Sequence, residues 1–132
     1  MEEKDSKINL YASPVNAGFP SPATDYVEDK LDLNEHLVRH PAATFFVKAS
    51  GDSMTGAGIF DGDILIVDRS LKPANSSIAI AVLDGDFTVK RLRMSKGRVT
   101  LLPENPKYKP VEIDEDSGFS VWGVVTYVIH KA

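Results

Sequence analysis

Cysteine is absent from the 132-residue sequence. Its absence excludes disulfide bonds, thiolate metal sites and cysteine nucleophiles, and it is typical of proteins in a reducing compartment. Histidine is scarce as well, since only His36, His40 and His130 are present and none belongs to an H-E-x-x-H motif. We therefore predict no metal site, and nothing in the sequence indicates a cofactor.

Long apolar runs are also missing, because none approaches the ~20 residues that a membrane helix needs. The N-terminus, MEEKDSKINL, is charged and lacks the apolar core of a signal peptide. A net charge of −4 excludes a general polyanion-binding protein, which would need a basic face. Residues 89–98 hold five cations and no acid; they could meet an acidic partner, but we interpret them as exposed faces of a hairpin. We predict a cytoplasmic protein with no membrane attachment and no direct sequence-specific DNA binding.

The first residues of the chain are predicted to form an extended arm. Pro14, Pro20 and Pro22 forbid a helix there and favour extended backbone. Taken alone, such a segment is more typical of a disordered leader. We assign residues 1–24 to a flexible arm and residues 25–132 to one folded domain, because a chain of this length can bury a single core.

A short helix is expected after the arm and before the strand-rich part, which begins near residue 43. Asp32 is a suitable N-cap with Glu35 three positions later, and Pro41 ends the helix.

Short apolar runs separated by turn signals fill the rest of the chain. Asp84 and Gly85 between two such runs are typical of a β-hairpin. No long helix separates the runs, so we predict a mainly antiparallel sheet folded on itself. Two of the runs, 63–68 and 77–83, are apolar on both faces and should be central strands. The expected strands are 44–50, 63–68, 77–83, 86–94, 98–104, 111–113 and 119–130.

The pentapeptide SGDSM, residues 50–54, forms a polar corner between two apolar runs. Such a corner is usually a turn, but Ser53 would be a nucleophile if a base removed its proton. The usual base is a histidine backed by a carboxylate, and the positions of the three histidines do not indicate such a triad. The alternative base is a lysine that is neutral at working pH, because burial lowers the lysine pKa from about 10.4.

Lys48 and Lys90 are the candidate bases, because both lie within predicted strands. Lys48 precedes the serine by only five residues along one strand, which is a poor geometry for contact. Lys90 shares a strand face with Thr88, Leu92 and Met94. We expect the last two side chains to exclude water and Thr88 to orient the amine. A lysine in a strand is more often a surface residue, so this pattern alone leaves Lys90 a candidate.

A resemblance to a known family adds to this interpretation. The segments SGDSM, GIFDGDILIVD and GDFTVKRL resemble the LexA/UmuD family of self-cleaving serine–lysine peptidases, and the match extends over nearly the whole chain from Ala17. Ser53 and Lys90 are 37 residues apart, the separation expected between nucleophile and base in UmuD-type members. The resemblance implies a LexA/signal-peptidase-like fold, a folded antiparallel sheet or partly open barrel with a short N-terminal helix and an extended arm.

The resemblance also implies an activity. The family's self-cleavage bond corresponds to that between Ala17 and Gly18, where a small residue suits a shallow pocket and glycine permits close approach. Ser53 would be the nucleophile and Lys90 the general base, with the backbone N–H groups of Asp52 and Ser53 stabilising the oxyanion. Val15–Ala17 are expected to add a strand along the cleft. The 35 residues between Gly18 and Ser53 permit cleavage within one chain or in a dimer partner.

The implied biology is that of the bacterial SOS response. Proteins of the UmuD type cleave themselves when a RecA filament forms on single-stranded DNA. The trimmed homodimer then joins the UmuC polymerase in an error-prone translesion DNA polymerase. Only 52 residues precede Ser53, which leaves no room for the DNA-binding domain of a LexA repressor.

Other interpretations remain open. A signal peptidase has a similar nucleophile motif but needs a membrane anchor. A phage or plasmid relative would keep the dyad and change the partner. A non-catalytic docking or adaptor protein would have no reason to retain Ser53, Lys90 and the Ala17–Gly18 bond together.

Overall fold

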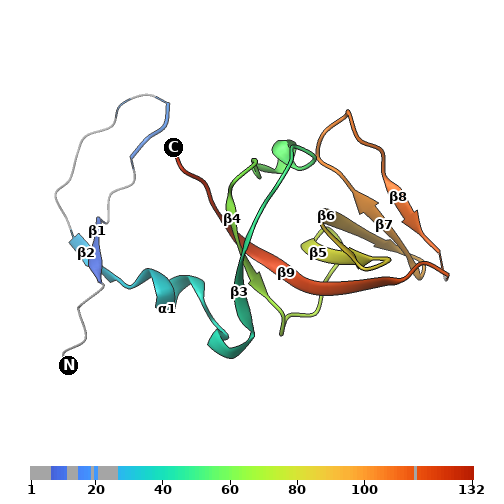
Figure 1. The fold of residues 1–132 in the computed structure, drawn as a ribbon. Helices are drawn as coiled ribbons and strands as arrows, with labels where there is room; N and C mark the ends of the chain where they lie inside the picture. The colour runs from blue at the N-terminus through green and yellow to red at the C-terminus, as the bar shows by residue number, and fades with distance from the viewer. Residues whose placement is uncertain (1–6, 12–14, 19, 21–26, 115) are drawn as a thin grey trace. The chain divides into compact units, whose positions relative to one another are not determined.

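The computed structural model describes residues 7–11, 15–18, 20, 27–114 and 116–132. The chain forms two compact units, Met1–Arg39 and His40–Ala132, which carry blue to cyan and cyan to red colours in Figure 1. No helix within the described ranges is long and apolar enough to cross a membrane.

The first unit contains a strand pair and one helical turn. Strand β1 (Ile8–Tyr11) pairs antiparallel with β2 (Val27–Leu31), and α1 (Leu33–Leu37) follows. Asp32 caps α1 as predicted, because its carboxylate accepts from the amides of Asn34 and Glu35. The pairing of β1 with β2 was not predicted.

The helix is also shorter than predicted. It stops at Leu37 because Val38 is extended, with φ −112° and ψ 100°, so Pro41 does not end it. The proposed boundary between residues 24 and 25 lies outside the described residues and stays a prediction.

The second unit is a single antiparallel sheet with the strand order β3-β4-β9-β5-β6-β7-β8. The sheet is not closed, because β3 and β8 have one neighbour each. This confirms the predicted mainly-β, LexA-like class, and the apolar β4 and β5 are internal strands as expected. The strands are β3 (Thr44–Lys48), β4 (Ile64–Asp68), β5 (Ile78–Leu83), β6 (Asp86–Ser95), β7 (Arg98–Leu102), β8 (Val111–Ile113) and β9 (Phe119–Ile129), with short 3₁₀ turns η1 (Pro41–Ala43) and η2 (Thr55–Ala57).

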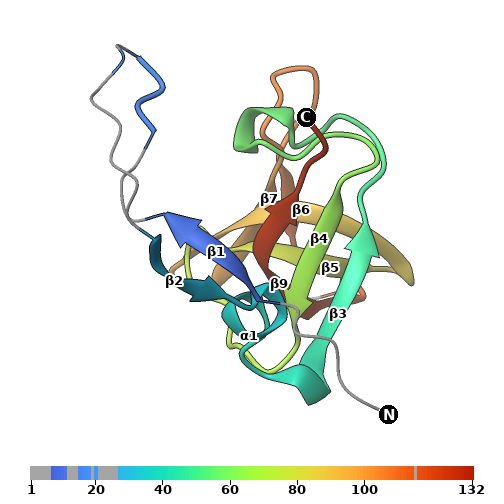
Figure 2. The same ribbon diagram turned by 90° about the vertical axis from the view of Figure 1, so that its left-hand side faces the viewer.

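Strand β9 links the two halves of the sheet. Its last residues pair with β4 and its first residues pair with β5, and Val124 faces a partner in each. Figure 2 shows β9 beside β4, with β3 on the far side of β4. Gly123 lies at this crossing, where a Cβ atom would come within 2.5 Å of Val67 Cγ1. A glycine is therefore required for the strands to approach here.

The buried side chains of this unit form two apolar clusters. The larger contains Ala49, Met54, Ile59, Leu65, Val67 and Ile80. The smaller contains Ala79, Ala81, Leu92 and Leu101. The β5–β6 hairpin turns at Asp84 and Gly85, with φ of 50° and 84°, as their sequence predicts. The strand β6 that carries Lys90 is thus placed beside the core.

Candidate active site

The corner at residues 50–54 is anchored on both sides. Ala49 before it and Met54 within it are buried in the larger apolar cluster. Gly51 has φ of 91°, a conformation that favours glycine, and its amide donates to Asp61 Oδ1 over 2.8 Å. Met54 is therefore a core residue. The corner leaves Ser53 half-buried at its tip.

Ser53 and Lys90 are brought together by the fold. Lys90 Nζ lies 2.9 Å from Ser53 Oγ, 2.9 Å from Thr88 Oγ1 and 3.0 Å from the carbonyl oxygen of Val89. Thr88 therefore orients the amine, as expected. Lys90, Thr88 and Val89 belong to the same strand, β6, and the hydrogen bonds to Thr88 and Val89 hold Nζ beside Ser53.

The contacts of Nζ suit an amine that exchanges protons with Ser53. An ammonium group donates to all three oxygens. A neutral amine has two N–H groups and one lone pair, so it can donate to Thr88 and Val89 while accepting from the Ser53 hydroxyl. Burial lowers the pKa of Lys90 from its usual value of 10.5, because a desolvated ammonium is disfavoured. The arrangement can act as a general base toward Ser53.

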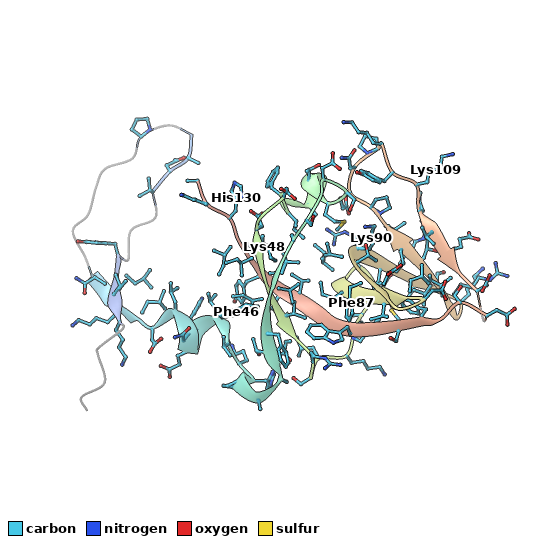
Figure 3. The ribbon with its side chains drawn as sticks, viewed as in Figure 1. Phe46, Lys48, Phe87, Lys90, Lys109 and His130 are labelled. Carbon is cyan, nitrogen blue, oxygen red and sulfur yellow. The ribbon has the colours of Figure 1, made fainter. Side chains whose placement is uncertain are left out.

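One expectation about the surroundings of Lys90 is wrong. Leu92 is buried as predicted, but Met94 is 40% exposed near the end of β6 and cannot exclude water. Met94 is too far along the strand, where β6 forms a hairpin with β7 at the molecular surface. Lys48, the other candidate base, is exposed on β3, and Figure 3 shows it on a different strand from Lys90.

A cleft of about 340 Å³ opens beside the pair. Phe87 comes from the same strand as Lys90 (Figure 3) and packs edge-on to Trp122, with ring centroids 6.1 Å apart. Trp122 also contacts Phe45, at 5.4 Å. Phe87 and Trp122 line the cleft together with Lys90, so the cleft can receive small apolar side chains. The apolar lining consists of Val47, Ala49, Leu65, Ile80, Phe87, Val89 and Trp122.

The predicted oxyanion donors lie at the same corner. Among the described residues, no acceptor receives a hydrogen bond from the amides of Asp52 or Ser53. Within the described part of the chain, these two N–H groups therefore have no competing acceptor.

A loop that the sequence did not single out holds this corner. In residues 103–108, the amide of Glu104 donates to the Ser53 carbonyl and the Asn105 side chain donates to the Asp52 carbonyl, both over 2.8 Å. The Tyr108 hydroxyl donates to the Asp52 carboxylate, and this bond raises the pKa of Tyr108. The turn residues in PENP were the only local signal; contacts with residues more than fifty positions away have no local signature.

The predicted cleavage bond lies in the first unit. Ala17 and Gly18 are exposed and form a bend, not the strand expected for Val15–Ala17. The Gly18 amide donates to Asn16 Oδ1 over 2.8 Å. This turn is local, since the asparagine side chain bonds to backbone two residues later.

The two histidines of the second unit, His40 and His130, make their described contacts away from Ser53 and Lys90. His40 and His130 each contact a buried carboxylate at 2.6 Å, Asp68 and Asp63 respectively. His36 and His40 are four positions apart, a spacing that suits metal binding on a continuous helix, but α1 ends at Leu37. No group of three or more histidine or acidic side chains in the described part of the chain could hold a metal ion.

Comparison with known proteins places these features in a family. Residues 9–126 match the model of the family described as Peptidase S24-like. The chain is 49% identical to protein SamA of Salmonella typhimurium, over 98% of this chain and 90% of that protein. It is 48% identical to protein ImpA of Escherichia coli, over 92% of this chain and 83% of ImpA. It is 40% identical to the LexA repressor of Stenotrophomonas maltophilia, over 83% of this chain and 52% of the repressor.

Proposed function

Because the chain belongs to the S24-like peptidase family, with relatives of the UmuD type and the LexA repressor among its matches, we propose that it is a serine endopeptidase that cleaves itself between Ala17 and Gly18. Ser53 is the nucleophile and Lys90 the general base. The observation that carries this proposal is the 2.9 Å contact between Lys90 Nζ and Ser53 Oγ at the edge of an apolar cleft.

The reaction proceeds through an acyl-enzyme. Neutral Lys90 accepts the Ser53 proton while Oγ bonds to the carbonyl carbon of Ala17. The resulting oxyanion accepts hydrogen bonds from the amides of Asp52 and Ser53. The intermediate collapses, the bond from Ala17 carbon to Gly18 nitrogen breaks, and Lys90 returns the proton to that nitrogen. Water then hydrolyses the ester, which releases Ser53 and leaves a carboxylate on Ala17. No cofactor is needed.

The turn at the cleavage bond must open before this reaction. Backbone in a protease cleft is extended, because it adds to a strand edge. Gly18 therefore has to release Asn16 Oδ1. The proposal holds for cleavage in the same chain and for cleavage in a dimer partner.

We also propose the cellular role that the UmuD-type relatives support. The protein acts in SOS mutagenesis in the cytoplasm, and a RecA nucleoprotein filament accelerates its cleavage. The trimmed homodimer, which begins at Gly18, then serves as a subunit of an error-prone translesion polymerase with UmuC.

The test is a time course of the purified protein followed by gel and intact mass. The wild type is incubated near neutral pH, with and without RecA, single-stranded DNA and a nucleotide triphosphate analogue, and again near pH 10. Ser53→Ala and Lys90→Ala are run in parallel. Lys72→Ala is the matched control, because Lys72 is exposed in the β4–β5 connection.

We expect a product that begins at Gly18 in the wild type and in Lys72→Ala, and none in the other two variants. Cleavage at pH 10 without any response to the filament would remove RecA from the proposal and keep the chemistry. Absence of cleavage in the wild type under every condition would contradict the peptidase assignment and favour a docking protein.

A further inference from the structure

The peptide between Asp52 and Ser53 is held by a side chain from the 103–108 loop. Asn105 Nδ2 donates to the Asp52 carbonyl oxygen over 2.8 Å. The other bond to this oxygen comes from the Thr55 amide and is longer, at 3.4 Å. Asn105 therefore makes the stronger of the two contacts that orient this carbonyl.

The orientation of the carbonyl decides the orientation of the Ser53 N–H. The peptide group is planar, and in the trans form its C=O and N–H point in opposite directions. The structure contains no cis peptide bond among its described residues. A donor that fixes the Asp52 oxygen on one side of the plane thus fixes the Ser53 N–H on the other side, where the oxyanion is proposed to form.

Asn105 is itself held in one orientation. Its Oδ1 accepts from the Lys107 amide over 3.0 Å, while its backbone carbonyl accepts from the Tyr108 amide over 3.1 Å. Because one end of the side-chain amide must accept and the other must donate, the alternative flip would lose both side-chain bonds. The side chain is half-buried, which limits competition from water.

The loop that carries Asn105 is fastened to the same corner by its neighbour. The Glu104 amide donates to the Ser53 carbonyl and its own carbonyl accepts from the Gly56 amide, at 2.8 and 2.7 Å. The Glu104 carboxylate pairs with Arg91 Nε at 2.5 Å. The loop therefore cannot move away from the serine without breaking several bonds together.

We infer that Asn105 is a positioning residue of the peptidase, which aims the Ser53 N–H at the oxyanion by holding the Asp52 carbonyl. This inference rests on the proposed function, because the oxyanion forms only in the proposed self-cleavage. The contact of Asn105 with the Asp52–Ser53 peptide group does not depend on that function. Asn105 makes no described hydrogen bond to Lys90, so its replacement should alter the rate without altering the titration of the base.

The test compares the pH–rate profile of self-cleavage in Asn105→Ala, Asn105→Asp and the wild type. Loss or misdirection of one oxyanion donor should lower the high-pH plateau roughly 10- to 100-fold while the midpoint stays constant. Asn105→Asp keeps an acceptor for the Lys107 amide but puts a carboxylate oxygen against the Asp52 carbonyl, so its plateau should be at least as low.

The matched control is Asn75→Ala. Asn75 Oδ1 also holds a backbone group, the Met94 amide, over 2.8 Å, but it does so at the far end of β6. This variant should keep the wild-type plateau even where it loses as much thermal stability as Asn105→Ala. A second readout needs no cleavage: the residual dipolar coupling of the Ser53 N–H, measured in the Lys90→Ala background, should change on replacing Asn105 and not on replacing Asn75.

The outcomes separate the inference from the proposed function. A wild-type plateau in Asn105→Ala, or a shifted midpoint at constant plateau, overturns the positioning role and leaves the dyad intact. An unchanged Ser53 dipolar coupling overturns it as well. If the wild type never cleaves itself, the proposed function fails, and the dipolar coupling alone then decides whether Asn105 fixes this peptide.

Discussion

The corner that carries Ser53 and the segment that carries Ala17 and Gly18 differ in how they are held. The corner lies between buried residues. Its Gly51 amide donates a hydrogen bond to the Asp61 carboxylate, and it accepts hydrogen bonds from Lys90 and the 103–108 loop. Residues 15–18 are exposed, with Val15 at 95%, and the bond from the Gly18 amide to Asn16 is the only hydrogen bond within this segment in the described chain. One region is fixed and the other can be reshaped at small cost.

This difference suits a protein that is both enzyme and substrate. Catalytic groups work best when their positions are fixed before the reaction, because no free energy is then spent on ordering them. A peptide substrate must instead become extended to enter a cleft. Changes to the corner should therefore slow the reaction strongly, whereas changes to the segment should alter it by small factors.

The largest effect is expected from Lys90→Arg. Arginine keeps the positive charge and the length of the side chain, but its guanidinium does not lose its proton in proteins. Self-cleavage at pH 10 should fall by at least about 10³-fold, within the range for loss of a general base. The measurement is the cleavage rate by intact mass, with Lys72→Arg as the control. Cleavage near the wild-type rate would mean that charge alone, and not proton acceptance, is what Lys90 supplies.

The second effect is the pH dependence of the wild type. Only the neutral amine accepts the Ser53 proton, so the rate should rise about tenfold per pH unit below the Lys90 pKa and level off above it. Because burial lowers the pKa of Lys90, the midpoint of the profile should lie below pH 10.5. The free energy of unfolding should also rise with pH across this window, since the unfolded chain binds the lysine proton more tightly.

The profile is followed from pH 6 to about 11 in low-salt buffer, with unfolding measured in parallel on Lys90→Met. In that variant the pH-dependent rise in stability should disappear. A midpoint at or above the usual lysine value would contradict the proposed burial of the amine.

A smaller effect is expected from Gly56→Ala, because this substitution would push the 103–108 loop away from the corner that carries Ser53. An added Cβ would lie 2.5 Å from the Glu104 carbonyl oxygen and 3.3 Å from its carbon. Both atoms are backbone, so the loop must shift, at a cost of about 1–3 kcal/mol in the free energy of unfolding. Cleavage should fall about tenfold as the corner loses support. Denaturant unfolding and the cleavage rate measure the two effects.

The control for this variant is Gly118→Ala. There the added Cβ would first meet the tip of the Asp84 side chain, at 2.9 Å, and a side chain can rotate away. This control should be milder in stability and unchanged in cleavage. Equal losses in both variants would show that the loop contact at Gly56 has no special role.

The sequence predicts the parts of this comparison that depend on local patterns. The Asp84–Gly85 hairpin follows from a turn type that needs positive φ at both positions. The internal strands β4 and β5 follow from runs that are apolar on both faces. These two inferences use residues close together in the chain. Ser53 and Lys90 are 37 residues apart, and they were paired through the resemblance to serine–lysine peptidases, because the local pattern alone left Lys90 only a candidate base.

The parts that were missed depend on contacts between distant residues. Asn105 and Tyr108 contact Asp52 across 53 and 56 positions, and nothing in a short polar loop indicates where it will pack. Met94 lies on the same face of β6 as Lys90, as the alternation of side chains along a strand predicts. It is nevertheless exposed, because it lies near the end of the strand, and the alternation does not show which part of a strand other residues will cover. The pairing of β1 with β2 was missed because the intervening prolines obscured it.

The smallest effect concerns the substrate segment. Asn16→Ala removes the side-chain oxygen that holds the Gly18 amide. An exposed hydrogen bond contributes about 0.5 kcal/mol or slightly more, so opening the turn should become easier and self-cleavage should accelerate about two- to fivefold. The rate is measured at the high-pH plateau, where the protonation of Lys90 no longer contributes.

Asn16→Asp is the matched control, because it keeps an oxygen at the same distance from the Gly18 amide and can form the same turn. It should cleave no faster than the wild type, while Asn16→Gln, whose longer side chain favours this turn less, should behave like Asn16→Ala. A slower reaction in Asn16→Ala would reverse the interpretation, since the asparagine would then contribute more to binding in the cleft than to holding the turn. Cleavage would then depend on specific contacts of both the Ser53 corner and residues 15–18, and the two regions would differ only in how exposed they are.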